Sequence, residues 1–390
     1  MLPSRVHRQM TVYGVVTAAT FSACSSAPTP LYHFYQEHFS LSPLTITIIF
    51  AVYAISLLVA LLTFGSISDH IGRKPAILIS LAVNALALLL FILAEGGSLL
   101  IAARIVQGLG MGMAIPTLGA AILDTDSLRG PMLNSITPFI GLTTGSLLTG
   151  ILMTFADYPS HLVFAVLLAV TAAEMLILLR MPETAHTKPG LIASLRPHVA
   201  IPASARSAVM RTSPVNIAGW ALGGFYLSLM PSLVATATGL HSPLIGASVV
   251  AVLMLVATAT VLITRNIAAT RVLPVGTLSL LAGVAVTLVG VSLQNVLLLF
   301  AGTIITGIGF GGNFSDILRI VLPLAHDDER AGLLSTFFVQ SYLAFALPAI
   351  GAGLMARDLG LSITAYIFGI GVMVLAAISL LAARRVASAA

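Results

Sequence analysis

The stretch GSISDHIGRKP, residues 65–75, separates two long apolar segments and decides how the chain folds. Gly65 lets neighbouring helices approach closely, and Gly72 permits a tight turn because glycine has no Cβ atom. Asp69 can cap a neighbouring helix N-terminus, where the helix dipole favours negative charge. An ordinary cytoplasmic hairpin would account for Arg73 and Lys74, but not for the spacing of the glycines and the aspartate. The stretch therefore predicts a loop built for a specific contact.

The composition around this loop is that of an integral membrane protein. Of 390 residues, 58% are hydrophobic and 8% are charged, whereas soluble proteins carry about 25% charged residues. These values, with one cysteine, exclude a soluble enzyme, a disordered chain, a disulfide scaffold and a cysteine-based zinc protein. The net charge of +5 includes no basic run longer than a pair, so nucleic acid is not an expected partner.

The apolar segments are long enough to be membrane-spanning helices, which need about 20 apolar residues each. Dividing the chain at its charged and Gly/Pro-rich breaks predicts an all-α membrane protein with twelve transmembrane helices. The predicted spans are residues 11–35, 43–67, 75–94, 98–123, 132–155, 161–180, 214–237, 243–263, 273–292, 296–323, 332–355 and 361–383.

The cationic residues predict the orientation of these spans. With a cytoplasmic N-terminus, fifteen of the 18 Lys and Arg residues fall in inside segments, and Arg357 alone falls in an outside loop. A cleaved signal peptide is the alternative for the N-terminus, but the apolar run after Arg8 continues without charge to Glu37, which is too long for one. We therefore expect a multi-pass protein of the cell (inner) membrane with both termini cytoplasmic.

A weak internal repeat predicts two halves of similar structure. Gly108, Gly110 and Gly112 in the fourth span recur 199 residues later in the tenth, as the glycines of the stretch GIGFG at 307–311. Gly307, Gly309 and Gly312 also fit the dinucleotide-binding pattern G-x-G-x-x-G, but that site needs a preceding strand. Small residues at this spacing serve helix packing in membranes. The proline-rich stretch between the repeats predicts an N-terminal six-helix half at 1–183, a cytoplasmic linker at 184–212 and a C-terminal six-helix half at 213–390.

The loop at 65–75 resembles the signature G-x-L-x-D-R-x-G-R-[KR]-x of the major facilitator superfamily, with His70 in place of the usual first arginine. Arg104, Gln107, Gly108 and Gly110 resemble that superfamily's R-x-x-Q-G-x-G in the fourth span. The resemblance implies two pseudo-symmetric six-helix bundles and a central cavity lined by spans 1, 4, 7 and 10. It also implies transport by rocking of the two halves, without a cofactor.

The same resemblance implies a conformational lock at the signature loop. In such transporters the loop aspartate is thought to pair with the loop arginine and with an acid at the end of span 4, holding one state against span 11. Carried onto this chain, the lock residues are Gly65, Asp69, Gly72, Arg73 and Lys74, with Asp124 or Asp126 as the acid of span 4.

Ionisable residues at membrane depth are costly and indicate function. Arg104 has two equal interpretations: a proton-relay partner or anchor for an anionic substrate, or an arginine bonded to carbonyls of the first span near its prolines. Asp316 and Arg319 lie three residues apart, which favours a structural ion pair, although Asp316 is also a candidate proton carrier. For Glu174, the other candidate, we expect a snorkelling side chain that faces water.

The uncharged candidates for a substrate cavity are few and largely apolar or aromatic, which favours a small hydrophobic or amphipathic organic molecule over a sugar. All nine histidines lie at span ends or in loops, so we expect no intramembrane metal site. The cavity candidates are Ser25, Ser26, Thr29, Tyr32, Gln107, Trp220, Tyr226, Asn313 and Gln340.

Three functional hypotheses follow. The first is a proton-coupled exporter of small organic compounds that works as a monomer in the lipid bilayer. A degenerate antiporter pattern at residues 141–150 is compatible with this hypothesis. The lack of an acid in span 1 is a departure from drug:proton antiporters. The second is an importer or facilitator of a small metabolite, an anionic one if Arg104 is its anchor. The third, an intramembrane enzyme or sensor, lacks the catalytic groups that it would need at depth, so we do not expect an enzyme.

Overall fold

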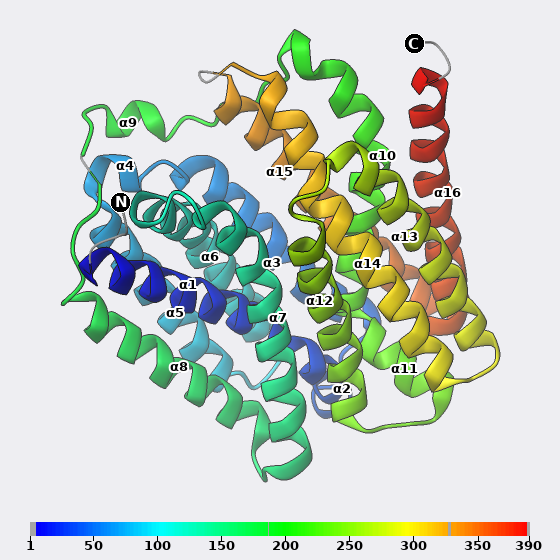
Figure 1. The fold of residues 1–390 in the computed structure, drawn as a ribbon. Helices are drawn as coiled ribbons and strands as arrows, with labels where there is room; N and C mark the ends of the chain where they lie inside the picture. The colour runs from blue at the N-terminus through cyan, green and yellow to red at the C-terminus, as the bar shows by residue number, and fades with distance from the viewer. Residues whose placement is uncertain (1–4, 186, 327–328, 388–390) are drawn as a thin grey trace. The chain divides into compact units, whose positions relative to one another are not determined.

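The computed structural model describes residues 5–185, 187–326 and 329–387, and every regular element among them is helical (Figure 1). The elements are α1 Arg5–Ser26, α2 Pro28–His38, α3 Pro43–Phe64, α4 Ser68–Ile71, α5 Arg73–Ile92, α6 Gly97–Thr125, α7 Gly130–Phe155, α8 Pro159–Leu178, α9 Leu191–Ser194, α10 Ala203–Ser228, α11 Met230–Thr238, α12 Pro243–Thr264, α13 Ala269–Ser292, α14 Val296–Val321, the 3-10 turn Leu322–Leu324, α15 Arg330–Leu359 and α16 Leu361–Ala387.

The predicted all-α membrane fold is confirmed. Ten of the described helices are long and apolar enough to cross a membrane, and α10 with α11 forms an eleventh span that bends by 65°. The predicted first span is α1 with α2, which break at Ala27 and are not among those eleven. The break follows from Pro28 and Pro30, because proline has no N–H to donate to the preceding turn.

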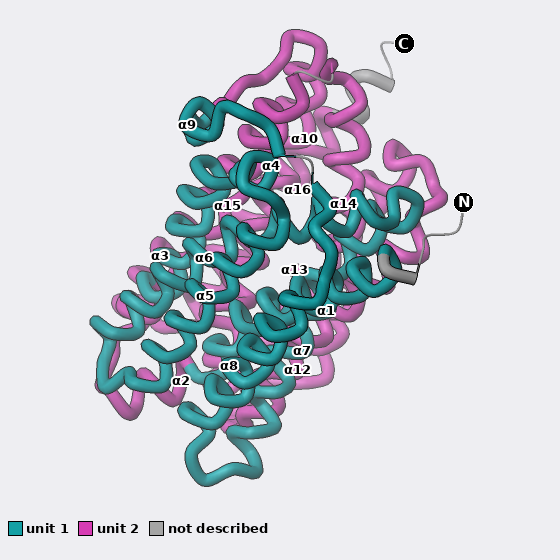
Figure 2. Tube along the Cα trace, turned by 90° about the vertical axis from the view of Figure 1, so that its left-hand side faces the viewer, with its two compact units in different colours: residues 1–31, 48–197 teal, residues 32–47, 198–390 magenta. Residues whose placement is uncertain are grey.

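The contacts divide the chain into two compact units (Figure 2). Unit 1 comprises residues 1–31 and 48–197, and unit 2 comprises residues 32–47 and 198–390. The segment that the sequence suggests as a linker is therefore shared, since its first part packs with unit 1 and its remainder with unit 2. Residues 32–47, which join the first two predicted spans, are grouped with unit 2.

Glycines set the helix spacing inside unit 1. A Cβ atom added at Gly108 or Gly112 would collide with the backbone of α3, at Tyr53 and Leu57 respectively. Gly110 faces α5 instead, where an added Cβ would lie 3.3 Å from the backbone nitrogen of Asn84. Small residues thus let α6 approach two neighbours closely, one from each side.

The repeated glycines of α14 have the same arrangement inside unit 2. Gly307 and Gly311 face α12, and Gly309 faces α13, where an added Cβ would meet the carbonyl oxygen of Gly276 and the amide of Leu280. The sequence repeat is therefore a repeat of packing: alternate glycines of the fourth helix in each half face the second and third helices. This packing explains the glycine pattern at 307–312 without a dinucleotide site.

Hydrogen bonds hold the segment between the halves, residues 188–200, at two places, one within each unit. In unit 1 the amide of Lys188 donates to the Asp69 carbonyl oxygen (2.8 Å), and His70 Nδ1 donates to the Lys188 carbonyl oxygen (2.8 Å). Ser66 Oγ also donates to the carbonyl oxygen of Ser194, at the end of α9 (3.2 Å). In unit 2 the amide of Ala200 donates to the carbonyl oxygen of Gly332 in α15 (3.3 Å).

Candidate functional site

The signature loop folds into a single helical turn, α4, that reverses into α5 at Gly72. The backbone φ of Gly72 is +99°, a conformation that L-residues with a side chain rarely adopt. A Cβ atom at this position would also lie 2.7 Å from a carboxylate oxygen of Glu183. Gly72 is therefore required both by the turn and by the group that packs on it.

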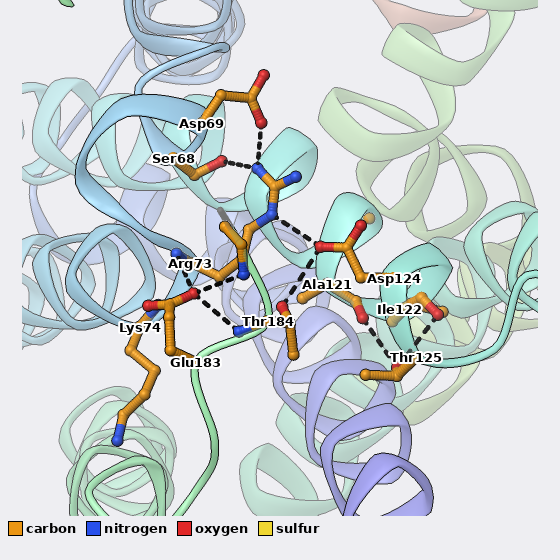
Figure 3. A network of polar contacts seen from close by, with 12 residues as sticks. Ser68, Asp69, Arg73, Lys74, Ala121, Ile122, Asp124, Thr125, Glu183 and Thr184 are labelled. Atoms are coloured by element: carbon orange, nitrogen blue, oxygen red, sulfur yellow. Dashed lines mark hydrogen bonds and ion pairs between the residues drawn. The ribbon is translucent and has the colours of Figure 1, made fainter. Parts of the chain in front are cut away.

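Arg73 is the centre of an ionic network that joins α4, α5 and α6 (Figure 3). Its Nη1 donates to Asp69 Oδ1 (2.5 Å) and to Ser68 Oγ (2.6 Å), and its Nε donates to Asp124 Oδ2 (3.1 Å). The Arg73 side chain is 10% exposed, whereas Asp69 and Asp124 are 40% and 31% exposed. A cation with little contact with water thus holds two carboxylates that water can reach.

Of the two acids considered for the end of span 4, Asp124 is the partner of Arg73. Asp124 Oδ2 also accepts from Thr184 Oγ1 (3.3 Å), so the network reaches the segment that follows α8. Asp126 serves another purpose: its Oδ1 accepts from the backbone amide of Arg129 (2.9 Å), just before α7 begins. At Gly65 an added Cβ would collide with the carbonyl oxygen of Leu61 in the preceding turn, whereas Pro116 Cγ of α6 would be at an ordinary contact distance of 3.9 Å, so Gly65 serves the local turn.

Glu183 is part of this network, although the sequence analysis did not single it out (Figure 3). One carboxylate oxygen accepts from the amides of Arg73 (2.8 Å), Thr184 (2.9 Å) and Ala185 (3.0 Å), and the other accepts from the amide of Lys74 (3.0 Å). Burial alone would raise the pKa of Glu183, but these four N–H groups outweigh it and hold the pKa below its ordinary value. Glu183 thus caps the N-terminus of α5.

Arg104 and Gln107 lie against the broken end of α1. Helix ends leave carbonyl groups without intrahelical donors, and Pro28 cannot donate to the carbonyl of Cys24, four residues earlier. Gln107 Nε2 donates to that Cys24 oxygen (2.9 Å), and Arg104 Nη1 donates to the Ser25 oxygen (2.9 Å) and to Gln107 Oε1 (2.7 Å). The geometry is that of the second interpretation of Arg104, a cation bonded to carbonyls of the first span.

Arg104 is also buried and packed on an aromatic ring. The side chain is 1% exposed, and its guanidinium carbon lies 4.9 Å from the centroid of the Tyr53 ring. The motif R-x-x-Q thus joins α6 to α1 and α3.

The polar residues at the break of the first span are turned into the protein. Ser25 Oγ donates to the Ser22 oxygen (2.9 Å). Ser26 Oγ lies 2.8 Å from the carbonyl oxygen of Leu142 and 3.2 Å from that of Ala23, either of which can accept its proton. Thr29 and Tyr32 are each 1% exposed. The structure therefore places these four cavity candidates in packed surroundings.

Glu174 does not snorkel to water, so that expectation is wrong. It is 4% exposed and lies on α8 against α1, where Thr20 Oγ1 lies 2.7 Å from its Oε1. Tyr13 of α1 donates to the backbone carbonyl of Glu174 (3.1 Å). Helix periodicity places Glu174 on a face of α8, but only packing shows that this face meets α1.

Asp316 and Arg319 of α14 form the expected ion pair. Arg319 Nη1 donates to Asp316 Oδ1 (2.8 Å), and the Arg319 and Asp316 side chains are 35% and 0% exposed. Arg319 Nη2 also donates to the carbonyl oxygen of Ile267 (2.7 Å), in the turn between α12 and α13. Asn313, one turn earlier, is buried and accepts from Thr277 Oγ1 of α13 (3.3 Å).

Unit 2 has an aromatic cluster with an amide group beside it. Trp220 of α10 is half-buried, and its ring centroid lies 5.1 Å from Tyr342, 5.8 Å from Phe345 and 6.0 Å from Phe314. One turn away, Gln340 donates to Ser213 Oγ (2.8 Å) and accepts from Asn216 Nδ2 (2.9 Å).

Tyr226 is placed away from this aromatic cluster. Its hydroxyl pairs with Thr303 Oγ1 of α14 (3.1 Å), and its ring lines a small apolar cavity with Thr287 of α13 and Phe368 of α16. Both aromatic side chains of α10 contact α14, but Trp220 does so at Phe314 and also contacts α15, whereas Tyr226 contacts Thr303 and lines its cavity with α13 and α16.

Comparisons with known proteins agree with this architecture. The chain resembles a crystal structure of a bacterial homologue of the human lysosomal transporter Spinster, with a TM-score of 0.78 and 14% identity over 98% of both chains. It also resembles the crystal structure of a point mutant of the nucleoside transporter NupG, with a TM-score of 0.71 and 14% identity over 96% of this chain and 99% of that one.

Among curated proteins, the multidrug resistance protein MdtL of Salmonella dublin and of Salmonella paratyphi C is 37% identical over 78 residues. The match spans 20% of this chain and 20% of the length of those relatives. The family model of the Major Facilitator Superfamily matches residues 14–315, most of the chain. The chain therefore belongs to the Major Facilitator Superfamily of membrane transporters.

Proposed function

We propose that this transporter exports small hydrophobic or amphipathic organic compounds in exchange for protons, by alternating access. It would act as a monomer in the inner cell membrane, with both termini cytoplasmic. The observation that supports this substrate class is the aromatic cluster around Trp220, which offers ring faces to an apolar or cationic molecule. Gln340, which bonds to Asn216 one turn before Trp220 on α10, supplies a polar group of the kind that orients organic ligands.

The partial match to multidrug resistance proteins favours export over import. The network around Arg73 supports a switching role for the signature loop. Arg73 bonds to Asp69 in α4 and to Asp124 in α6, so movement of α4 relative to α6 would break one of these ion pairs and keep the other. Because both carboxylates are partly exposed, water can replace the lost partner, and the pairs can exchange at modest cost.

The test is a growth-inhibition panel of chemically diverse toxic compounds in an efflux-deficient bacterium. The host would express wild type, Asp69→Asn, Trp220→Ala or Asp358→Asn at equal membrane abundance. The last variant is the matched control, because Asp358 also pairs with an arginine, Arg357, but is exposed and lies outside the signature loop. We expect resistance from wild type and Asp358→Asn, and its loss in the other two.

Two results would contradict the proposal. Full resistance with Asp69→Asn would remove the switching role of the loop. A host made more sensitive to a metabolite analogue by wild type, without protection from any compound, would instead establish uptake.

A further inference from the structure

A buried line of polar side chains runs between α1, α5 and α8 in unit 1. Tyr13, Thr17 and Thr20 are spaced four and three residues apart, so they share one face of α1. That face meets Glu174 of α8. Asn84 of α5 donates to Thr171 Oγ1, one turn before Glu174 (3.3 Å). The members of this polar seam, each at most 8% exposed, are Tyr13, Thr17, Thr20, Asn84, Thr171 and Glu174.

The hydroxyl of Thr20 can accept a hydrogen bond from a protonated Glu174. Thr20 Oγ1 lies 2.7 Å from Glu174 Oε1 and 3.2 Å from the carbonyl oxygen of Val16. A threonine hydroxyl has one proton and cannot donate to both oxygens at once. If Glu174 is protonated on Oε1, the acid donates to Thr20 Oγ1, and Thr20 donates to Val16. Every short contact then has a donor.

Thr17 of α1 is a second hydroxyl beside the Glu174 carboxyl group. Glu174 Oε2 and Thr17 Oγ1 are both buried, and the Thr17 hydroxyl interacts with the carboxyl group. The groups of α1 that face the Glu174 carboxyl are therefore neutral hydroxyls, which do not offset a negative charge as a cation would.

No cation of the described chain neutralises Glu174 by an ion pair, whereas Asp316 pairs with Arg319. The titratable groups that interact with Glu174 are Tyr13 and Cys24, both from α1 and both neutral when protonated. From α5 the seam receives the amide of Asn84, and no titratable side chain of α7 contacts Glu174 in the described structure. Buried without a counter-ion, Glu174 differs from Asp316 in that its charge is governed by a proton alone.

We propose that Glu174 is the proton-binding group of this transporter, and that its proton is the one exchanged for substrate. The exchange of this proton for substrate rests on the proposed function, whereas proton binding by Glu174 does not. In this proposal the bound proton lies on Oε1, between Glu174 and Thr20. On release the O–H bond breaks and the proton passes to water, while the Thr20 hydroxyl turns from the Val16 oxygen to the carboxylate. α8 thus supplies to α1 the acid that the sequence of the first span lacks.

The proton can be observed without knowledge of the substrate. Infrared difference spectroscopy of the purified full-length protein during a pH titration would record the C=O stretching band of a neutral buried carboxylic acid. We expect the band in wild type and in Asp316→Asn, and its loss in Glu174→Gln. In Thr20→Val the band should shift, because the acid loses its hydrogen-bond acceptor. A band that survives in Glu174→Gln, or that Asp316→Asn removes, would overturn the assignment.

Coupling is tested in everted membrane vesicles with tetraphenylphosphonium as the probe. Wild type should accumulate the probe when a proton gradient is imposed. Glu174→Gln should lose this accumulation but retain downhill movement of the probe, which also shows that the variant is folded. Glu174→Asp should restore part of the accumulation. Gradient-driven accumulation at the wild-type level in Glu174→Gln would overturn the coupling role.

A wild type that moves no probe in either direction would contradict the proposed function and, with it, the coupling role. The infrared band would still decide whether Glu174 binds a proton, so the two failures are distinguishable.

Discussion

Replacement of Glu183 should release the start of α5. The amides of Arg73 and Lys74 are the first two of that helix, and the first amides of a helix have no intrahelical acceptor. Their acceptor is the carboxylate of Glu183, at 2.8 and 3.0 Å. Their protection from solvent therefore depends on one side chain that lies more than a hundred residues later in the sequence.

The size of the effect follows from the two contributions that Glu183→Ala removes. Loss of a capping acceptor costs about 1 kcal/mol, and loss of a negative charge at a helix N-terminus costs about 0.3–1 kcal/mol. Since the side chain is exposed, we expect a total of about 1–2 kcal/mol, equivalent to a roughly 5–30-fold change in an equilibrium constant. Glu183→Gln, which keeps one acceptor oxygen without the charge, should have a smaller effect.

The assay is hydrogen–deuterium exchange of the purified transporter, followed at the amides of Arg73 and Lys74. In Glu183→Ala these amides should exchange about 5–30 times faster than in wild type. Amides in the middle of α5 should serve as the internal control, because their acceptors are within the helix. Unchanged exchange at residues 73 and 74 would refute the assignment of Glu183 as the cap of α5.

The same assay has a pH dependence whose sign is fixed by the lowered pKa of Glu183. A carboxyl with a pKa below its ordinary 4.5 stabilises the folded state above that value, and the stabilisation is lost as pH falls through the lowered pKa. After correction for intrinsic exchange rates, protection at residues 73 and 74 should persist at pH about 4.5 and disappear only in more acidic solution. Protection lost already above that pH would contradict the lowered pKa.

Three further predictions concern packing and the network. Gly309→Ala should lower thermal stability by about 1–3 kcal/mol through collision with α13, while Gly219→Ala, which meets open space, should raise it by about 0.5–1 kcal/mol; equal melting temperatures would contradict the packing. Arg104→Lys should cost about 1–3 kcal/mol, because the shorter donor cannot keep both of its hydrogen bonds, and an unchanged melting temperature would disprove this. Asp124→Asn should impair transport whereas Asp126→Asn should not, and equal transport rates at equal membrane abundance would exclude Asp124 as the partner of Arg73.

The features that could be predicted from sequence are those encoded by local spacing. The glycines of the fourth and tenth spans pack as their periodicity suggests, because a small residue at a fixed helical interval has one physical use in a membrane. The bonds of Arg104 to the broken first span were one of two interpretations, since Pro28 necessarily leaves a carbonyl without a donor.

The remaining features depend on contacts between distant segments. Glu183 lies near the start of a polar stretch, and nothing in its neighbourhood shows that it meets the N-terminus of a helix 110 residues earlier. The sequence favours a Glu174 that snorkels to water. Its burial depends on which face of α8 meets α1, and a hydropathy pattern with few polar residues does not determine that. The sequence predicts where helices occur, but it does not predict which face of each helix packs against which neighbour.

The hydrogen bonds that hold the segment between the halves, one set in each unit, leave only a short length of chain between them. Ser194 is tied to the signature loop and Ala200 to the first turn of α15, so a tether of six residues joins the anchors. Fully extended, six residues span about 20 Å, whatever arrangement the units adopt. While both anchors hold, the signature loop and α15 cannot separate further than this tether allows. In the proposed alternating-access cycle, the length of this tether would limit the separation of these two segments.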